Sequence, residues 1–164
     1  MDHTISDGGI TAVIRAQGAE LRSLRDPQGT EYIWQAGPAW PRCAPVLFPI
    51  VGRLTGDRLR HGGQTYRLTQ HGFARDRTFD WLDRRADACR LALVDVAETR
   101  AMYPFAFRLE LGYAACNSCK WKADTGSWDV FSWMPNLGTT GHSGPSRRSR
   151  AFCRCQTQSR QLGS

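Results

Sequence analysis

The sequence predicts a mostly β protein, an antiparallel β-sandwich with a poorly structured C-terminal tail. Several short segments alternate apolar and polar residues, most clearly residues 105–113, where every odd position is large and apolar. Turn-forming Pro and Gly separate these segments, and many short strands at such spacing are typical of a sandwich. Past Tyr113 the alternation stops, and Ser, Gly, Thr and Arg dominate from Leu137 onward. We therefore expect a partial β-sandwich domain over residues 1–113 and a divergent, disordered tail over residues 114–164.

The first strands follow from local pattern. Residues 11–16 form a short apolar run, and residues 19–25 place their leucines unevenly on one face, as a bulged strand does. Residues 26–29 read Asp-Pro-Gln-Gly, a turn in which Pro presets φ and Gly tolerates positive φ. Residues 31–34 resume strand chemistry, so the sequence predicts a hairpin around this turn.

Later elements follow in the same way. Residues 61–64, His-Gly-Gly-Gln, predict a second hairpin that leads into residues 65–68. Residues 78–82 and 89–95 alternate and predict two more strands. A short helix is expected over residues 97–102, ended by Pro104.

The composition excludes several classes of protein. The chain has 164 residues, enough for one domain with a sizeable core. Its longest apolar run, residues 45–52, is too short to cross a bilayer, and residues 1–7 carry acids where a secretory leader carries Lys or Arg. We expect a cytoplasmic protein that does not enter a membrane, with its six cysteines reduced.

The net charge of +7 does not indicate nucleic-acid binding, because the excess is confined to the last third of the chain. Up to Tyr113 there are 15 arginines and no lysine against 13 acids, a net of +2. Arg147, Arg148 and Arg150 lie among Ser, Gly and Pro, without interleaved aromatic residues that could stack bases. We interpret this run as part of a solvated tail and expect no nucleic-acid partner.

Residues 44–54 and 70–76 contain the candidate site. Arg53 follows Gly52, His71 precedes Gly72, and Arg75 lies four residues after His71, all with apolar and aromatic neighbours. Cationic and imidazole groups beside aromatic side chains can bind a small polyhydroxylated molecule, with or without an anionic group. The pattern indicates a small-molecule partner of this kind, and we expect no cofactor and no metal.

Five segments in one order strengthen this interpretation: Gly-Ala-Glu-Leu at 18–21, Glu-Tyr-Ile-Trp at 31–34, residues 44–54, residues 71–76, and Tyr-Pro-Phe-Ala-Phe at 103–107. With them the chain resembles the aldose 1-epimerase (galactose mutarotase-like) family, and within it the branch that includes hexose-6-phosphate mutarotases. The resemblance implies a β-supersandwich, of which this chain holds part. It also implies interconversion of the α and β anomers of a free sugar.

The resemblance assigns roles by position. Arg53 matches the sugar-contacting arginine of the family, and His71 matches its first active-site histidine, which holds and polarises the substrate. Arg75 matches the phosphate-facing arginine of the sugar-phosphate branch. These residue types suit the chemistry, because ring opening needs one group to accept the anomeric hydroxyl proton and another to protonate the ring oxygen. His71 is thus the expected catalytic residue, and Arg53, His71 and Arg75 the expected substrate-binding residues.

Structural alternatives exist for each of these residues. Arg53 and Arg75 could be ion-pair partners of Asp57 and Asp76, and His71 could cap a loop. His3 and His61 are interpreted as ordinary surface residues. The aromatic residues Trp34, Phe48 and Phe73 fit a core position as well as a wall against which a sugar stacks.

The resemblance does not extend beyond about Tyr113. In the family the second histidine, a carboxylate ligand and the glutamate base come from the second half; here no glutamate follows Glu110, and the flanks of His142 do not match. A truncation or shifted reading frame after about Tyr113 is the hypothesis for this change, and an uninterrupted frame encoding the same tail would contradict it. The cysteines at 116, 119, 153 and 155 form a weak alternative zinc set.

Two functions follow from the sequence. The first is an aldose 1-epimerase-like isomerase fragment that binds a hexose or hexose phosphate, with impaired anomer interconversion because the acid/base half is missing. The alternative is a noncatalytic carbohydrate-binding or vestigial domain that uses the same residues. The sequence does not indicate the oligomeric state.

Overall fold

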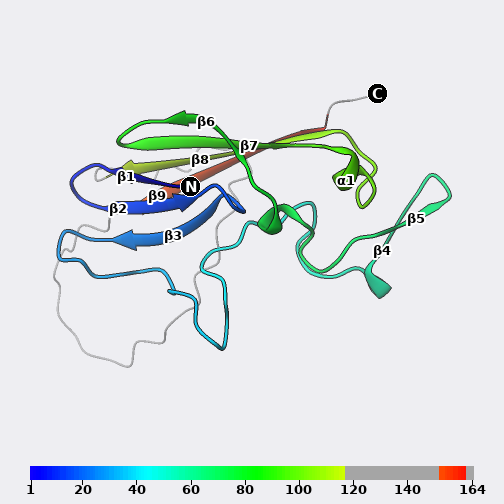
Figure 1. The fold of residues 1–164 in the computed structure, drawn as a ribbon, viewed down its shortest axis with the longest axis horizontal. Helices are drawn as coiled ribbons and strands as arrows, with labels where there is room; N and C mark the ends of the chain where they lie inside the picture. The colour runs from blue at the N-terminus through cyan, green and yellow to red at the C-terminus, as the bar shows by residue number, and fades with distance from the viewer. Residues whose placement is uncertain (117–151, 162–164) are drawn as a thin grey trace, which may run out of the picture.

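The protein folds into two antiparallel sheets and a separate small hairpin (Figure 1). The computed structural model describes residues 1–116 and 152–161; residues 117–151 and 162–164 lie outside the described part. The strand orders are β1-β2-β3, β4-β5 and β6-β7-β8-β9. This architecture of strands with little helix confirms the predicted fold class.

The first sheet comprises β1 (Asp2–Ser6), β2 (Thr11–Arg15) and β3 (Glu20–Arg25). Strands β2 and β3 were expected from the sequence, whereas β1 was not, because its exposed residues interrupt the apolar pattern. Val13 pairs with Ser23 but Ile14 pairs with Leu21, so Arg22 is an extra residue on β3. The bulge predicted in this strand is thereby confirmed.

The turn after β3 forms as predicted, but the strand expected over residues 31–34 does not. Gly29 N donates to the carbonyl of Asp26 at 3.0 Å, closing the turn. Beyond it only an isolated bridge joins Glu31 to Arg25. The Glu31 carboxylate accepts the amide of Leu24 at 2.9 Å, the group that would donate to Tyr32 if the ladder continued. The predicted hairpin therefore stops at this turn and bridge.

The second sheet comprises β6 (Asp80–Arg84), β7 (Ala88–Val94), β8 (Phe107–Cys116) and β9 (Phe152–Gln161). The short helix α1 (Ala97–Arg100) joins β7 to β8, as the sequence predicts. Strand β9 pairs antiparallel with β8 along its whole length. It falls in the segment where we expected a tail, because residues 152–161 are mostly polar and lack apolar alternation. The domain boundary after Tyr113 stays a prediction.

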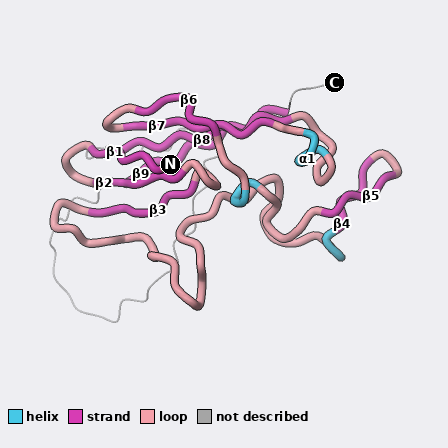
Figure 2. Tube along the Cα trace, in the orientation of Figure 1, coloured by secondary structure: helices cyan, strands magenta, loops and turns pink. Residues whose placement is uncertain are grey.

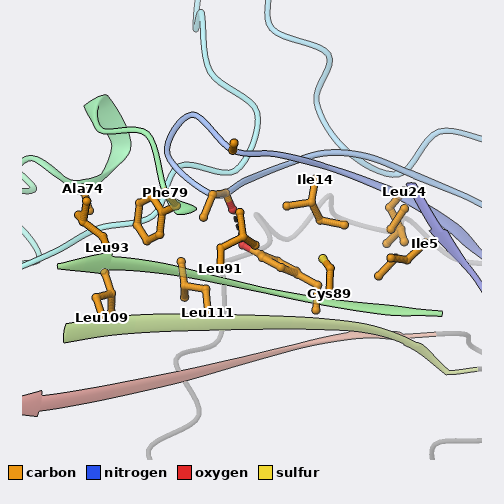
Figure 3. Close-up of a cluster of buried hydrophobic side chains, with 14 of the residues drawn as sticks. Ile5, Ile14, Leu24, Ala74, Phe79, Cys89, Leu91, Leu93, Leu109 and Leu111 are labelled. Carbon is orange, nitrogen blue, oxygen red and sulfur yellow. Dashed lines mark hydrogen bonds between the residues drawn. The ribbon is translucent and has the colours of Figure 1, made fainter. Parts of the chain in front are cut away.

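The hydrophobic core lies between the two sheets. Figure 3 shows Ile5, Ile14 and Leu24 of the first sheet on the side that faces Cys89 and Leu91 of β7. The Tyr113 hydroxyl on β8 donates to the carbonyl of Ala19 at 2.6 Å and adds a polar link across the core. Burial of these side chains is the main source of stability.

Long loops connect the sheets and carry the candidate site (Figure 2). Two 3-10 turns lie in them, η1 (Thr55–Asp57) and η2 (Ala74–Asp76), with the hairpin of β4 (Arg58–His61) and β5 (Gln64–Arg67) between them. This hairpin confirms the one predicted around residues 61–64. Among the described residues, no helix has the length and apolar character needed to cross a bilayer.

Candidate functional site

The two segments that carry the candidate residues lie side by side. Phe48 and Gly72 form a parallel bridge, and the carbonyl of Phe48 accepts the amides of Phe73 at 2.9 Å and Ala74 at 3.2 Å. Gly72 has φ +69°, and a Cβ there would lie 2.1 Å from the Phe48 oxygen. Only glycine permits this approach, which brings His71 against Gly52.

His71 is held by two hydrogen bonds to Gly52. Its backbone amide donates to the Gly52 carbonyl at 2.8 Å, and the Gly52 amide donates to Nδ1 at 3.0 Å. A ring nitrogen that accepts an N–H carries no proton, so the proton of the neutral imidazole lies on Nε2. Nε2 lies 3.3 Å from the amide nitrogen of Gln70, so two donors face each other; the contact is a hydrogen bond when the Gln70 amide is turned to place its oxygen there. The loop therefore fixes the tautomer of His71 and makes Nε2 its donor atom.

Arg53 is paired with Asp57. Its Nε and Nη2 donate to the two carboxylate oxygens at 2.7 and 2.9 Å, and 63% of the Arg53 side chain is exposed. The hydrogen bond from Arg53 lowers the pKa of the Asp57 carboxyl, and the same contact raises the pKa of Arg53. The ion-pair alternative considered for Arg53 is thus present. The third guanidinium nitrogen, Nη1, takes no part in this ion pair. The sugar-contacting role of Arg53 stays a prediction.

Arg75 lies on η2 with only 17% of its side chain exposed. Its Nη2 donates to the carbonyl of Gln70 at 2.8 Å, directly before His71. Its Nε is buried without a hydrogen-bond partner and lies 3.7 Å from Asp76 Oδ2, too far for a hydrogen bond. The contact is an ion pair, so the ion-pair alternative considered for Arg75 is present, and Asp76 also accepts from Arg42 at 2.7 Å. The predicted phosphate-facing role of Arg75 is untested by this geometry.

The structure therefore brings His71 and Arg75 together, whereas Arg53 is near them only through its backbone. Gln70 contacts both the His71 ring and the Arg75 guanidinium. Arg53 follows Gly52, the partner of His71, but its side chain turns to Asp57. Sequence reasoning missed Gln70 and the Arg42–Asp76 pair. The position of Gln70 next to His71 was the available signal, whereas nothing in the sequence pairs residues 42 and 76.

The other residues considered take structural positions. His61 contacts the ring of Phe105, with ring centroids 4.6 Å apart, and His3 contacts Trp81 at 5.6 Å. Phe73 is a core residue and Phe48 is half-buried against it. Trp34 is 56% exposed and is not a core residue.

The remaining candidates lie outside what the structure describes. His142 and Cys119 are in residues 117–151, and the side chains of the other three cysteines of the weak zinc set are not described. Among the described residues no group of three His, Cys, Asp or Glu side chains is arranged to hold a metal ion.

The two facing antiparallel sheets form a β-sandwich, a fold that solved mutarotase-related proteins share. A galactose mutarotase related enzyme from Lactobacillus acidophilus is 44% identical, with a TM-score of 0.70 over 71% of this chain and 40% of that one. A galactose mutarotase-like protein from Lactobacillus casei is 38% identical, with a TM-score of 0.67 over 70% of this chain and 40% of that one. Protein LacX of Lactococcus lactis is 32% identical over 63% of this chain and 37% of its own length.

The family model for aldose 1-epimerase matches residues 1–125. The chain belongs to the aldose 1-epimerase family. It spans about two fifths of the length of the relatives it matches.

Proposed function

We propose that this chain binds a hexose or hexose phosphate through Arg53, His71 and Arg75, and that it is an aldose 1-epimerase-like isomerase with impaired anomer interconversion. The observation that carries the proposal is the His71 imidazole, which Gly52 holds with its donor nitrogen Nε2 beside Gln70. This arrangement lies within the segment that the family model matches. The cytoplasmic location and a small-molecule partner in place of nucleic acid belong to the same proposal.

The chemistry of ring opening suits these groups. Nε2–H of His71 donates to the ring oxygen or a hydroxyl of the sugar and polarises it as the ring opens. Nη1 of Arg53 and the free donors of Arg75 bind hydroxyls or a phosphate on the sugar. A guanidinium carries five N–H donors, and the Gln70 carbonyl accepts from Nη2 alone, so the Arg75 side chain retains donor capacity for a ligand.

Anomer interconversion is impaired because a second group is needed for the other proton transfer. The hydrogen-bond partners of His71 in the described part of the chain are Gly52 and Gln70, neither of which is a carboxylate. No glutamate follows Glu110 in the sequence, so the glutamate base typical of the family has no counterpart there. A single imidazole supplies one of two proton transfers, and the second falls to water.

The lack of a carboxylate beside His71 in the described part of the chain also favours the alternative, a noncatalytic carbohydrate-binding domain. Polarimetry of freshly dissolved glucose, galactose and glucose 6-phosphate with the full chain separates the two functions. Saturation-transfer NMR measures binding of the same sugars in parallel. Faster anomer exchange that His71→Gln abolishes supports the isomerase, binding without faster exchange supports the alternative, and absence of binding contradicts both.

The role of Arg75 has its own test. Arg75→Ala should weaken binding of glucose 6-phosphate by about tenfold or more, because a charge-assisted hydrogen bond to phosphate is lost. Binding of glucose should change far less. Arg90→Ala is the matched control, since Arg90 is exposed on β7 and makes no ion pair in the described residues. Equal losses for the two sugars would contradict a phosphate-facing Arg75.

A further inference from the structure

The hairpin of β4 and β5 stands apart from both sheets and projects from the molecule (Figures 1 and 2). Gly62 and Gly63 connect its strands with φ of 56° and 74°, as a two-residue type I′ turn requires. This turn fixes the register, in which Arg58 lies opposite Arg67 and Arg60 lies opposite Thr65. The hairpin thus has two defined faces.

One face of the hairpin packs onto the protein. Leu59 contacts the core cluster, and the ring of His61 lies 4.6 Å from that of Phe105. Tyr66, opposite Leu59, is half-buried. Because side chains alternate along a strand, Arg58, Arg60 and Arg67 project from the opposite face, and all three are exposed. We call this opposite surface the arginine face.

The guanidinium groups of the arginine face form no ion pair within the described part of the chain, although the charge of Arg67 adds to the effect of Arg53 in lowering the pKa of Asp57. Nine arginines form ion pairs there, but Arg58, Arg60 and Arg67 are not among them. The adjacent acid, Asp57, has both oxygens bonded by Arg53. Arg58 and Arg67 lie directly opposite each other, an unfavourable arrangement for like charges. An anionic ligand would relieve it.

The edge of β4 is also open. In a hairpin with a two-residue turn, the pairs His61–Gln64 and Leu59–Tyr66 exchange the interstrand hydrogen bonds, and the bond from Leu68 N to Asp57 O at 2.9 Å continues this pattern. The N–H and C=O groups of Arg58 and Arg60 therefore point away from β5. Within the described residues they make no hydrogen bond to another segment. The two arginines offer backbone groups and guanidinium groups from one edge.

We propose that the outer edge of β4 binds an extended acidic peptide segment as a third strand, with carboxylates at alternate positions paired to the arginine face. Side chains of neighbouring strands repeat every second residue, so alternate acids come level with Arg58 and Arg60. The aromatic rings of the hairpin region lie on the other face, which disfavours base stacking by a single-stranded nucleic acid. A second copy of this chain paired at the same edge would place arginines against arginines, which disfavours it.

The test uses the full chain and a short fluorescein-labelled peptide of alternating glutamate and threonine, followed by anisotropy at low and high salt. We expect saturable binding that weakens with salt, and no binding of the same peptide with glutamine in place of glutamate. Arg58→Gln/Arg60→Gln should weaken binding about tenfold. Arg84→Gln/Arg90→Gln removes the same charge from exposed positions on the second sheet and should change binding less than twofold.

Two further measurements test strand addition itself. Amide exchange of Arg58 and Arg60 in the unmodified protein should slow when the peptide is added, a readout that does not depend on folding of a variant. A peptide methylated at alternate backbone nitrogens keeps its charge and should bind much more weakly. The proposal is overturned if the two double variants lose binding equally, or if amide exchange does not change when the peptide is added. It is also overturned if the methylated peptide binds equally well, or if a single-stranded oligonucleotide of equal charge binds more tightly.

Discussion

Gly72 lies against the carbonyl of Phe48, where the two candidate segments meet. Gly72→Ala adds a Cβ 2.1 Å from that oxygen and 2.6 Å from Pro49 Cδ, at a φ of +69°. We expect the free energy of unfolding to fall by more than about 3 kcal/mol, since backbone atoms must move apart. Urea denaturation measures it. Gly29→Ala is the control, because Gly29 has φ +83° with nothing within 4 Å of its Cβ position, and it should cost about 1 kcal/mol. Similar losses for both variants would contradict the close approach.

The Glu31 carboxylate links β3 to the loop that follows it. Burial alone would raise its pKa, but hydrogen bonds from the amides of Leu24 and Ile33 and from the Ser23 hydroxyl outweigh burial and lower it. Because the pKa of Glu31 is lower in the folded state, its carboxylate stabilises the protein fully at pH values above its pKa in the unfolded chain, about 4.3. This stabilisation is lost as the pH falls through the folded-state pKa.

Glu31→Gln should therefore lower the free energy of unfolding at pH 7 by about 1–3 kcal/mol and flatten its dependence on pH below about 5. Urea denaturation over this pH range measures both effects. The exposed Glu98 provides the matched control, Glu98→Gln, which should leave the profile almost unchanged. A profile for Glu31→Gln parallel to that of the unmodified protein would rule out this role.

At the scale of elements, the connection between β7 and β8 depends on Thr99. This residue of α1 is fully buried, and its hydroxyl accepts from Val96 N and donates to Val96 O, each at 2.9 Å. Thr99→Val keeps the shape but removes both bonds, and we expect a loss of about 1–3 kcal/mol in the free energy of unfolding. Thr99→Ser keeps the hydroxyl and should lose less. Chemical denaturation of the two variants measures both losses. A larger loss for Thr99→Ser than for Thr99→Val would contradict the expectation.

At the scale of the whole molecule, the two sheets share one core. Leu91 of β7 is fully buried in that core, so Leu91→Ala should cost about 2–5 kcal/mol and raise amide exchange in both β2 and β8. Leu82→Ala changes a side chain that is 39% exposed on the neighbouring strand and should cost less than about 1 kcal/mol. Faster exchange in only one sheet would show that the sheets unfold as separate units.

Much of the fold could be predicted from local pattern. The alternation in residues 78–82, 89–95 and 105–113 and the His-Gly-Gly-Gln turn correspond to observed strands and a hairpin. Predictions failed where a side chain takes a backbone hydrogen bond from a strand, or where a strand forms only by pairing with another segment. The Glu31 carboxylate binds the amide of Leu24, which a longer ladder would use, and β1 gains its partners only by pairing with β2. The candidate site was predictable as residue types, but its hydrogen bonds were not.

By itself, the sequence determined the fold class, the positions of most strands and the segments that carry Arg53, His71 and Arg75, because these follow from local periodicity and turn chemistry. Only the tertiary structure decided the direction of each polar side chain. It paired Arg53 with Asp57, tied Arg75 to Gln70 and set the His71 tautomer through Gly52. The physical reason is that these contacts depend on close approach of loops, which the packing of the two sheets imposes and no local pattern encodes.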